Sequence, residues 1–168
     1  MPRVCAPGRS SGVSKIRLPN YLHLSTNEKT MTTDFETTGQ RIAYLQKKYG
    51  TAKAHRLEQY GDLDLTFDGW QVSDVHGEQI EGRPYVNVSL YYTDRGSCIG
   101  HIVRTLPVSR EYSNEVTKAK TGTFARPADL LKWLREDGRG YLGNNSKIAW
   151  EEYCDKLPWL QQSATVRA

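Results

Sequence analysis

The stretch from Tyr85 to Leu106 constrains the fold more than any other part of this chain. β-Branched and aromatic residues fill both of its halves, and such residues favour strands. The polar segment Asp94-Arg95-Gly96 separates the two halves. Because glycine adopts positive φ angles without a Cβ clash, Gly96 can close a three-residue loop with a bulge. The stretch therefore predicts a β-hairpin in which Val88 lies opposite Ile102.

Successive side chains of a strand point to opposite faces of its sheet. In this register the second face of the hairpin carries Tyr85 and Tyr91 on one strand and His101 on the other. We expect either that a helix covers this face or that it is exposed. A two-residue loop would shift the register by one and move every side chain of the second strand to the other face. The first face of the first strand carries an apolar row: Val86, Val88, Leu90 and Tyr92.

The segment before the hairpin has both helical and strand-like patterns. Thr33-Asp-Phe-Glu36 has capping-box spacing, and apolar residues then recur at helical spacing as far as Gly50. A second short helix, or the continuation of a kinked one, is predicted over residues 51–61. Strict alternation predicts a half-buried strand over residues 62–68.

After the hairpin, residues 107–123 are polar and predict a long loop. The spacing of apolar residues then predicts a helix from Pro127 to Gly138 and a second from Asn144 or Asn145 to Pro158. The fold should therefore be α+β, with an antiparallel meander sheet of three or four strands. Helical segments before and after the sheet should pack on one of its faces.

Charge is distributed unevenly along the 168 residues, whose formal net charge is +4. Five of the 23 basic residues but one of the 19 acidic residues precede Met31, so the rest of the chain is neutral. The composition of residues 1–33 predicts a disordered or loosely attached basic arm. Met31 resembles the natural first residue of a protein, so the residues before it are expected to be an upstream extension. Residues 34–160 should form one α+β domain, and residues 161–168 a flexible tail.

Cysteine usage and hydropathy bound the class of protein. Cys5, Cys98 and Cys154 are odd in number and lack metal-ligand spacing, which argues against a disulfide framework and a zinc site. The chain also has no apolar run that approaches about 18 residues. We therefore expect a soluble cytoplasmic protein without a membrane span.

One segment matches the dinucleotide-binding fingerprint letter for letter, namely Gly138-Arg-Gly-Tyr-Leu-Gly143. That fingerprint requires a preceding strand, whereas a helix is predicted here. We therefore interpret the segment as a turn between helices and expect no cofactor. A weaker hypothesis is that the start of the last helix holds an anion together with Arg139 and Lys147.

No catalytic motif emerges from the sequence, so we expect an interaction module rather than an enzyme. Its partner should be a protein, contacted through the second hairpin face and the 107–123 loop. One alternative is nucleic-acid binding through the basic arm and the loop lysines. Another is a metal-dependent hydrolase, because alternation puts three carboxylates on one strand face: Asp62, Asp64 and Asp68. The candidate binding residues are Tyr85, Tyr91, His101, Arg110, Tyr112, Lys118 and Lys120.

Overall fold

The computed structural model describes residues 35–108 and 115–161. The predicted arm over residues 1–33, Met31 and nearly all of the predicted tail lie outside these residues. Two candidate binding residues, Arg110 and Tyr112, lie outside them as well. No helix in the described ranges is long and apolar enough to cross a membrane.

The first helix, α1 (Thr38–Tyr49), begins later than its sequence predicts. The capping box is formed by Thr37 and Gln40. The predicted cap residue, Thr33, lies outside the described residues. The Thr37 hydroxyl accepts from the Gln40 amide, and the Gln40 side chain accepts from the Thr37 amide at 2.9 Å. Gly50 ends the helix with a φ of 84°, a conformation that glycine adopts readily.

The prediction of a second helix over residues 51–61 is wrong. Residues 53–57 form strand β1 (Lys53–Leu57), which pairs antiparallel with β2 (Leu65–Val75). The pairing buries alternate side chains of β1, among them Leu57, against aromatic residues of the sheet. This tertiary contact outweighs the weak helical spacing of the segment.

Strand β2 begins later than predicted, at Leu65, and continues to Val75. Its first part pairs with β1, and from Gly69 onward it pairs with β3 (Tyr85–Thr93). The two strands approach so closely at Gly69 that a Cβ there would lie 2.6 Å from the carbonyl oxygen of Tyr92. We call residues 53–69 the β1–β2 arm.

The central hairpin is confirmed. Strand β4 (Cys98–Leu106) pairs with β3 so that Val88 lies opposite Ile102 and Ser89 lies opposite His101. Gly96 has a φ of 84°, as the bulged loop requires. The predicted loop over residues 107–123 is wrong in its second half, because residues 116–124 form strand β5 (Val116–Phe124) against β4.

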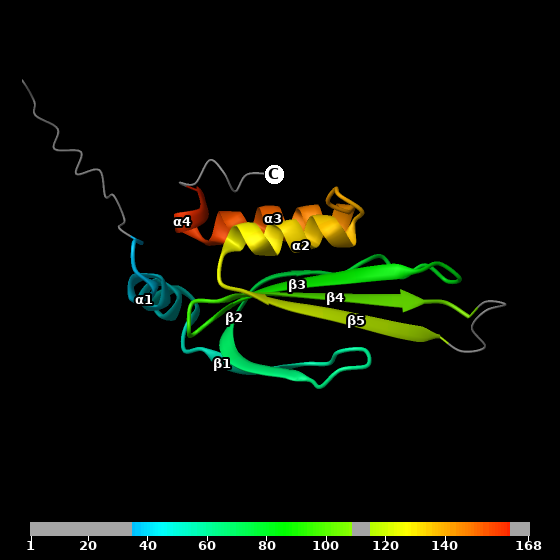
Figure 1. Ribbon diagram of the computed structural model, residues 1–168, viewed down its shortest axis with the longest axis horizontal. Helices are drawn as coiled ribbons and strands as arrows, with labels where there is room; N and C mark the ends of the chain where they lie inside the picture. Colours follow the sequence, from blue (N-terminus) through cyan, green and yellow to red (C-terminus); the bar gives the residue numbers. More distant parts are fainter. Residues whose placement is uncertain (1–34, 109–114, 162–168) are drawn as a thin grey trace, which may run out of the picture. The chain divides into compact units, whose positions relative to one another are not determined.

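The five strands form one antiparallel meander in the order β1-β2-β3-β4-β5, one strand more than the predicted upper bound (Figure 1). Helix α2 (Pro127–Asp137) packs on β4 and β5, and α3 (Asn144–Lys156) packs on β2 and β3. A short helix, α4 (Pro158–Gln161), follows. The α+β class, with helices before and after the sheet, is therefore confirmed, and the two helices after the sheet, α2 and α3, pack on one of its faces.

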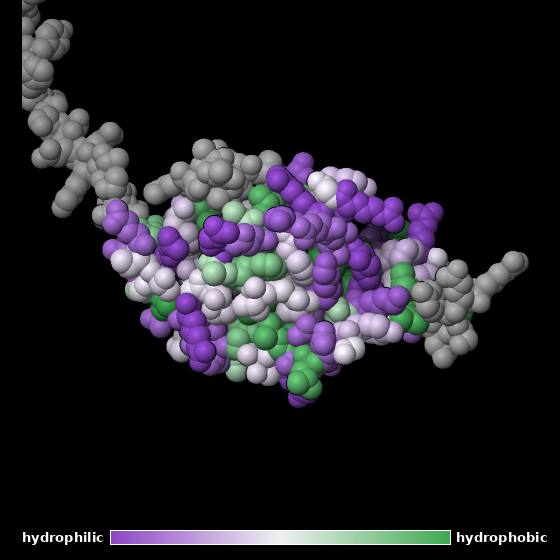
Figure 2. Space-filling view, viewed as in Figure 1, coloured by the Kyte–Doolittle hydropathy of each residue, from purple (hydrophilic) through white to green (hydrophobic). Residues whose placement is uncertain are grey.

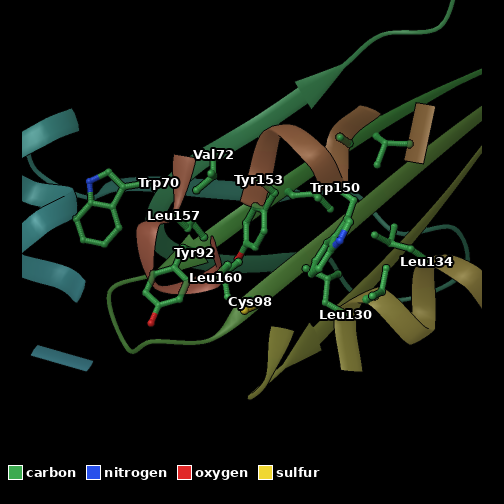
Figure 3. Close-up of a cluster of buried hydrophobic side chains, with 14 of the residues drawn as sticks. Trp70, Val72, Tyr92, Cys98, Leu130, Leu134, Trp150, Tyr153, Leu157 and Leu160 are labelled. Atoms are coloured by element: carbon green, nitrogen blue, oxygen red, sulfur yellow. The ribbon is translucent and has the colours of Figure 1, made fainter. Parts of the chain in front are cut away.

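The main core lies between this helical layer and the sheet. Figure 3 shows its side chains converging from both layers, with Tyr153 and Trp150 of α3 above the strands. The apolar row predicted for the hairpin faces this core. The buried residues of the core include Val88, Leu90, Tyr92, Cys98, Ile102, Leu130, Leu134, Trp150, Tyr153 and Leu157.

Candidate functional site

The second face of the sheet is covered in part by the β1–β2 arm rather than by a helix. A small separate cluster there contains Leu57, Tyr91 and Ile99. The rings of His55 and Phe67 lie 5.0 and 5.3 Å from the Tyr91 ring, between centroids. Tyr91 is consequently only 5% exposed, and burial raises the pKa of its hydroxyl.

The arm extends across the second face as far as the last strand. The amide of Tyr60, which follows β1, donates to the carbonyl of Ala119 in β5 at 3.1 Å. The two edges of the meander therefore meet at one point, and the sheet curls around its second face (Figure 1). This curl separates the face into a covered part and an open groove.

The groove lies beside the arm and has a volume of about 630 Å³. We call it the β2 groove. It is lined by residues 65–68 of β2, His55 of β1, residues 93–95 at the hairpin turn, Ile99 and Thr123. The lining combines apolar side chains with the charges of Asp68 and Arg95, neither of which forms an ion pair with a described residue. Such a mixed groove suits a polypeptide with both apolar and polar side chains.

On the side away from β1, the backbone of β2 in this groove lacks a partner strand. In an antiparallel strand, successive residues direct their N–H and C=O groups to alternate sides. The Asp68 carbonyl accepts from the Asp94 amide at 3.0 Å, on the side of β3. Thr66 therefore directs its backbone groups to that same side, where β3 has already ended. Among the described residues, no strand pairs with β2 at this edge.

Two apolar side chains between β1 and β2 are exposed. Leu63, at the turn of the arm, is 90% exposed, and Tyr60 is 64% exposed. Figure 2 shows apolar atoms protruding at the lower edge of the molecule, where Figure 1 places the arm. Isolated exposed leucines are common, but Leu63 is two residues from Leu65, which lines the groove.

Polar groups cluster further along the second face. The Ser89 hydroxyl donates to Oδ1 of Asp74 at 2.7 Å, and the His76 Nε2 lies 3.1 Å from Oδ2 of the same carboxylate. The serine and the histidine thus contact the carboxylate rather than each other. The partner of the Ser89 hydroxyl is therefore a carboxylate, and His76 does not form the serine–histidine hydrogen bond that activates many serine nucleophiles.

His101 lies opposite Ser89, as the bulged register predicts. Its Nδ1 is 2.9 Å from the Thr121 hydroxyl of β5. Burial lowers the pKa of the imidazole, and the charge of Glu58 opposes that shift more weakly. The ring is therefore biased toward its neutral form.

The candidate binding residues do not form one surface. Tyr91 and His101 lie on the second face, whereas Tyr85 lines a separate hollow with Val108 and Glu115 near the other end of β3. Lys118 and Lys120 are on β5 rather than in a loop. The Lys120 ammonium lies 4.9 Å from the centroid of the Trp133 ring on the helical side of the sheet.

The prediction that three carboxylates share one strand face is wrong, because β2 begins only at Leu65. Asp62 and Asp64 precede the strand, and Asp64 accepts from Arg56 at 2.6 Å. In residues 35–108 and 115–161 no cluster of three or more metal-ligating side chains occurs. The strand-face argument for the metal-dependent alternative therefore fails, and the alternative itself stays a prediction.

Sequence reasoning missed the residues of the β2 groove because it assigned His55 to a helix and Ile99 to no site. The alternation of His55 and Leu57 was the available signal. No known protein family, curated protein or solved structure matches this chain.

Proposed function

We propose that this domain is a protein-interaction module that binds an extended segment of a partner protein in the β2 groove. The segment would pair with the free edge of β2 at Thr66 as an additional strand. The observation that carries the proposal is this unpaired backbone beside an apolar floor. Addition of a strand gives affinity through main-chain hydrogen bonds and specificity through alternate side chains.

The groove determines what kind of segment fits. Every second side chain of an added strand points toward the same face. Those side chains would contact the floor formed by Phe67 and Ile99, and Leu63 would extend the contact at one end. Asp68 and Arg95 at the rim could pair with charges on the partner. We therefore expect a segment with alternating apolar residues.

The test is peptide selection from a random library displayed on phage, with the full chain as the target. The affinity of a recovered peptide is then measured by calorimetry for two variants of one residue. Thr66→Ala keeps the backbone amide and should bind like the original chain. Thr66→Pro removes the amide and should weaken binding at least about tenfold, because an added strand loses a main-chain hydrogen bond and meets the proline ring.

A folded-state control accompanies this pair. Both variants should retain the amide spectrum of β3 and β4, because Thr66 is exposed and directs its amide away from β1. Equal peptide affinity for the two variants would contradict strand addition. Selection of peptides that bind elsewhere, as mapped by amide shifts, would contradict the groove itself.

The nucleic-acid alternative remains a prediction. Its basic arm lies outside the described residues, and Lys120 already contacts Trp133 and Asp137. Binding of a single-stranded oligonucleotide, followed by fluorescence anisotropy, should then weaken steeply with salt because counterions are released from phosphates. Absence of any salt-dependent binding would eliminate this alternative.

A further inference from the structure

The outer strand of the sheet, β5, carries basic side chains that form a cluster with β4 (Figure 1). The register places Lys118 opposite Arg104 and Lys120 opposite Ile102. Residues directly opposite each other, and residues two apart on one strand, share a face of the sheet. Because Ile102 belongs to the main core, the three cations lie on the helical side at the outer edge. We call these cations, together with Tyr60, the β5 patch.

The Asp137 carboxylate holds two of these cations in place. Arg104 donates to both of its oxygens, with N–O distances of 3.3 and 2.5 Å, and the Lys120 Nζ lies 3.8 Å from it. The side chain of Asp137 is only 9% exposed, whereas those of Arg104 and Lys120 are 43% and 51% exposed. With Lys118, the cluster has three cations and one carboxylate and thus a formal charge of +2, and its positive groups are the ones that reach solvent.

Aromatic rings lie beside both lysines. The Lys120 ammonium is 4.9 Å from the centroid of the Trp133 ring, and the Lys118 ammonium is 6.0 Å from that of Tyr60. Tyr60 is 64% exposed, and the bond from its amide to the Ala119 carbonyl fixes it at the β5 position between the two lysines. Such a ring can stack on a nucleic-acid base while the neighbouring cations contact phosphates.

The backbone of β5 provides further donors at the same edge. The Ala119 carbonyl points away from β4, so the amides of Thr117, Ala119 and Thr121 point outward as well. Within residues 35–108 and 115–161, no strand pairs with this side of β5. Lysines on an edge strand hinder its pairing with another chain. They favour an anionic ligand instead, and phosphate oxygens accept from exposed backbone amides.

We infer that the β5 patch binds a single strand of nucleic acid, with one base stacked on Tyr60 and the adjacent phosphates beside Lys118 and Lys120. A double strand is a poorer ligand, because its bases are already stacked on one another and do not reach the ring. The inference gives the nucleic-acid alternative a surface within the described residues. The side chains of the patch do not line the β2 groove, so the proposed function and this inference can fail separately.

The test is the fluorescence anisotropy of a labelled oligothymidine of about 12 nucleotides, titrated with the full chain at low salt. Lys118→Gln and Lys120→Gln should each weaken binding about threefold to tenfold. Each should also reduce the slope of log affinity against log salt by about 0.7, the value for one phosphate contact with a single strand. Tyr60→Leu should weaken binding about fivefold or more, whereas Tyr60→Phe keeps the ring and should bind like the original chain.

A lysine–tyrosine pair on α1 provides the matched control. The Lys48 ammonium lies 5.1 Å from the centroid of the Tyr49 ring, and Tyr49 is 38% exposed. Lys48→Gln and Tyr49→Leu therefore remove the same charge and the same ring outside the β5 patch. Both should bind the oligonucleotide like the original chain, and all variants should retain the amide spectrum of the folded domain.

Three outcomes would overturn the inference. The first is that the full chain does not bind the oligonucleotide, or that the α1 variants lose as much affinity as the patch variants. The second is equal affinity of Tyr60→Leu and the original chain, which would mean that no base stacks on the ring. The third is equal affinity for a double strand, or displacement by polyglutamate as effective as by unlabelled oligothymidine, which would assign the patch to polyanions in general.

Discussion

The hydroxyl of Tyr153 donates a hydrogen bond to the backbone carbonyl of Tyr91 at 3.2 Å. Tyr153 is completely buried in the core beneath α3. The side chain of Tyr91 projects from the opposite face of the sheet and contacts the rings of His55 and Phe67. Residue 91 therefore connects the helical layer to the β1–β2 arm that forms the β2 groove.

Replacement of Tyr153 by phenylalanine should lower the free energy of unfolding by about 1 kcal/mol, the usual net value of one hydrogen bond. The ring would keep its packing, so the loss should come from the hydroxyl alone. Urea denaturation of the two proteins measures the difference. Tyr141→Phe is the matched control, because Tyr141 is exposed, and a similar loss in that variant would contradict the assignment.

Tyr91→Ala should loosen the β1–β2 arm in particular. The substitution removes the ring between His55 and Phe67, and deletion of a buried aromatic side chain costs about 3 kcal/mol or more. Amide hydrogen exchange over residues 53–69 should accelerate more than exchange in α2. Tyr85→Ala, on the same face of β3 but half-buried and outside this cluster, should leave the arm protected; equal acceleration in both variants would refute the role of Tyr91.

The sequence was informative where contacts are local. The register of the hairpin depends on the alternation of residues 85–93 and on one glycine, Gly96. Both features are visible in the sequence, so the register could be predicted. The helices after the sheet were predicted from Pro127 and from the apolar spacing of their residues. In each case the residues that decide the structure are close together in the chain.

The β1–β2 arm could not be predicted in this way. Ala54, Leu57 and Tyr60 are spaced as in a helix, and only the contacts of β1 with distant aromatic residues select a strand. Strand β5 was missed because its polar residues, such as Thr117 and Thr123, resemble a loop. The free edge at Thr66 depends on β2 changing partners at Gly69, which no local pattern indicates.

Gly100→Ala should destabilise the protein because α2 packs directly on β4 at this position. An added Cβ would lie 2.6 Å from Cζ3 of Trp133 and 2.8 Å from Cδ1 of Leu130. Overpacking of this kind costs about 1–3 kcal/mol, which urea denaturation would detect. In the control Gly39→Ala the nearest neighbouring atom is 4.0 Å away, so stability should not fall; equal losses would contradict the packing.

Cys98 should resist alkylation in the native protein. Burial raises the pKa of its thiol to about 11, and the reactive thiolate is therefore scarce at neutral pH. Mass spectrometry after iodoacetamide treatment should find Cys98 modified only once the chain is unfolded in urea. Native labelling as fast as in the unfolded chain would show that the core opens readily beneath α3.

His101 should make the folded state less stable as the pH falls. Burial lowers the pKa of the folded imidazole below the unfolded value of about 6.5. At pH values between these two pKa values, the unfolded chain therefore binds the proton more readily than the folded chain. Stability is therefore lost as the pH decreases from the unfolded pKa toward the folded pKa. His101→Gln removes this contribution and should show a smaller loss between about pH 7.5 and pH 5.

Urea denaturation at a series of pH values measures both curves, and an NMR titration of the His101 ring measures the folded pKa directly. The other three histidines, His23, His55 and His76, are present in both proteins, so the difference between the curves isolates His101. Parallel curves would contradict the prediction. A folded pKa above the unfolded value would mean that the charge of Glu58 outweighs burial, and the stability difference should then change sign.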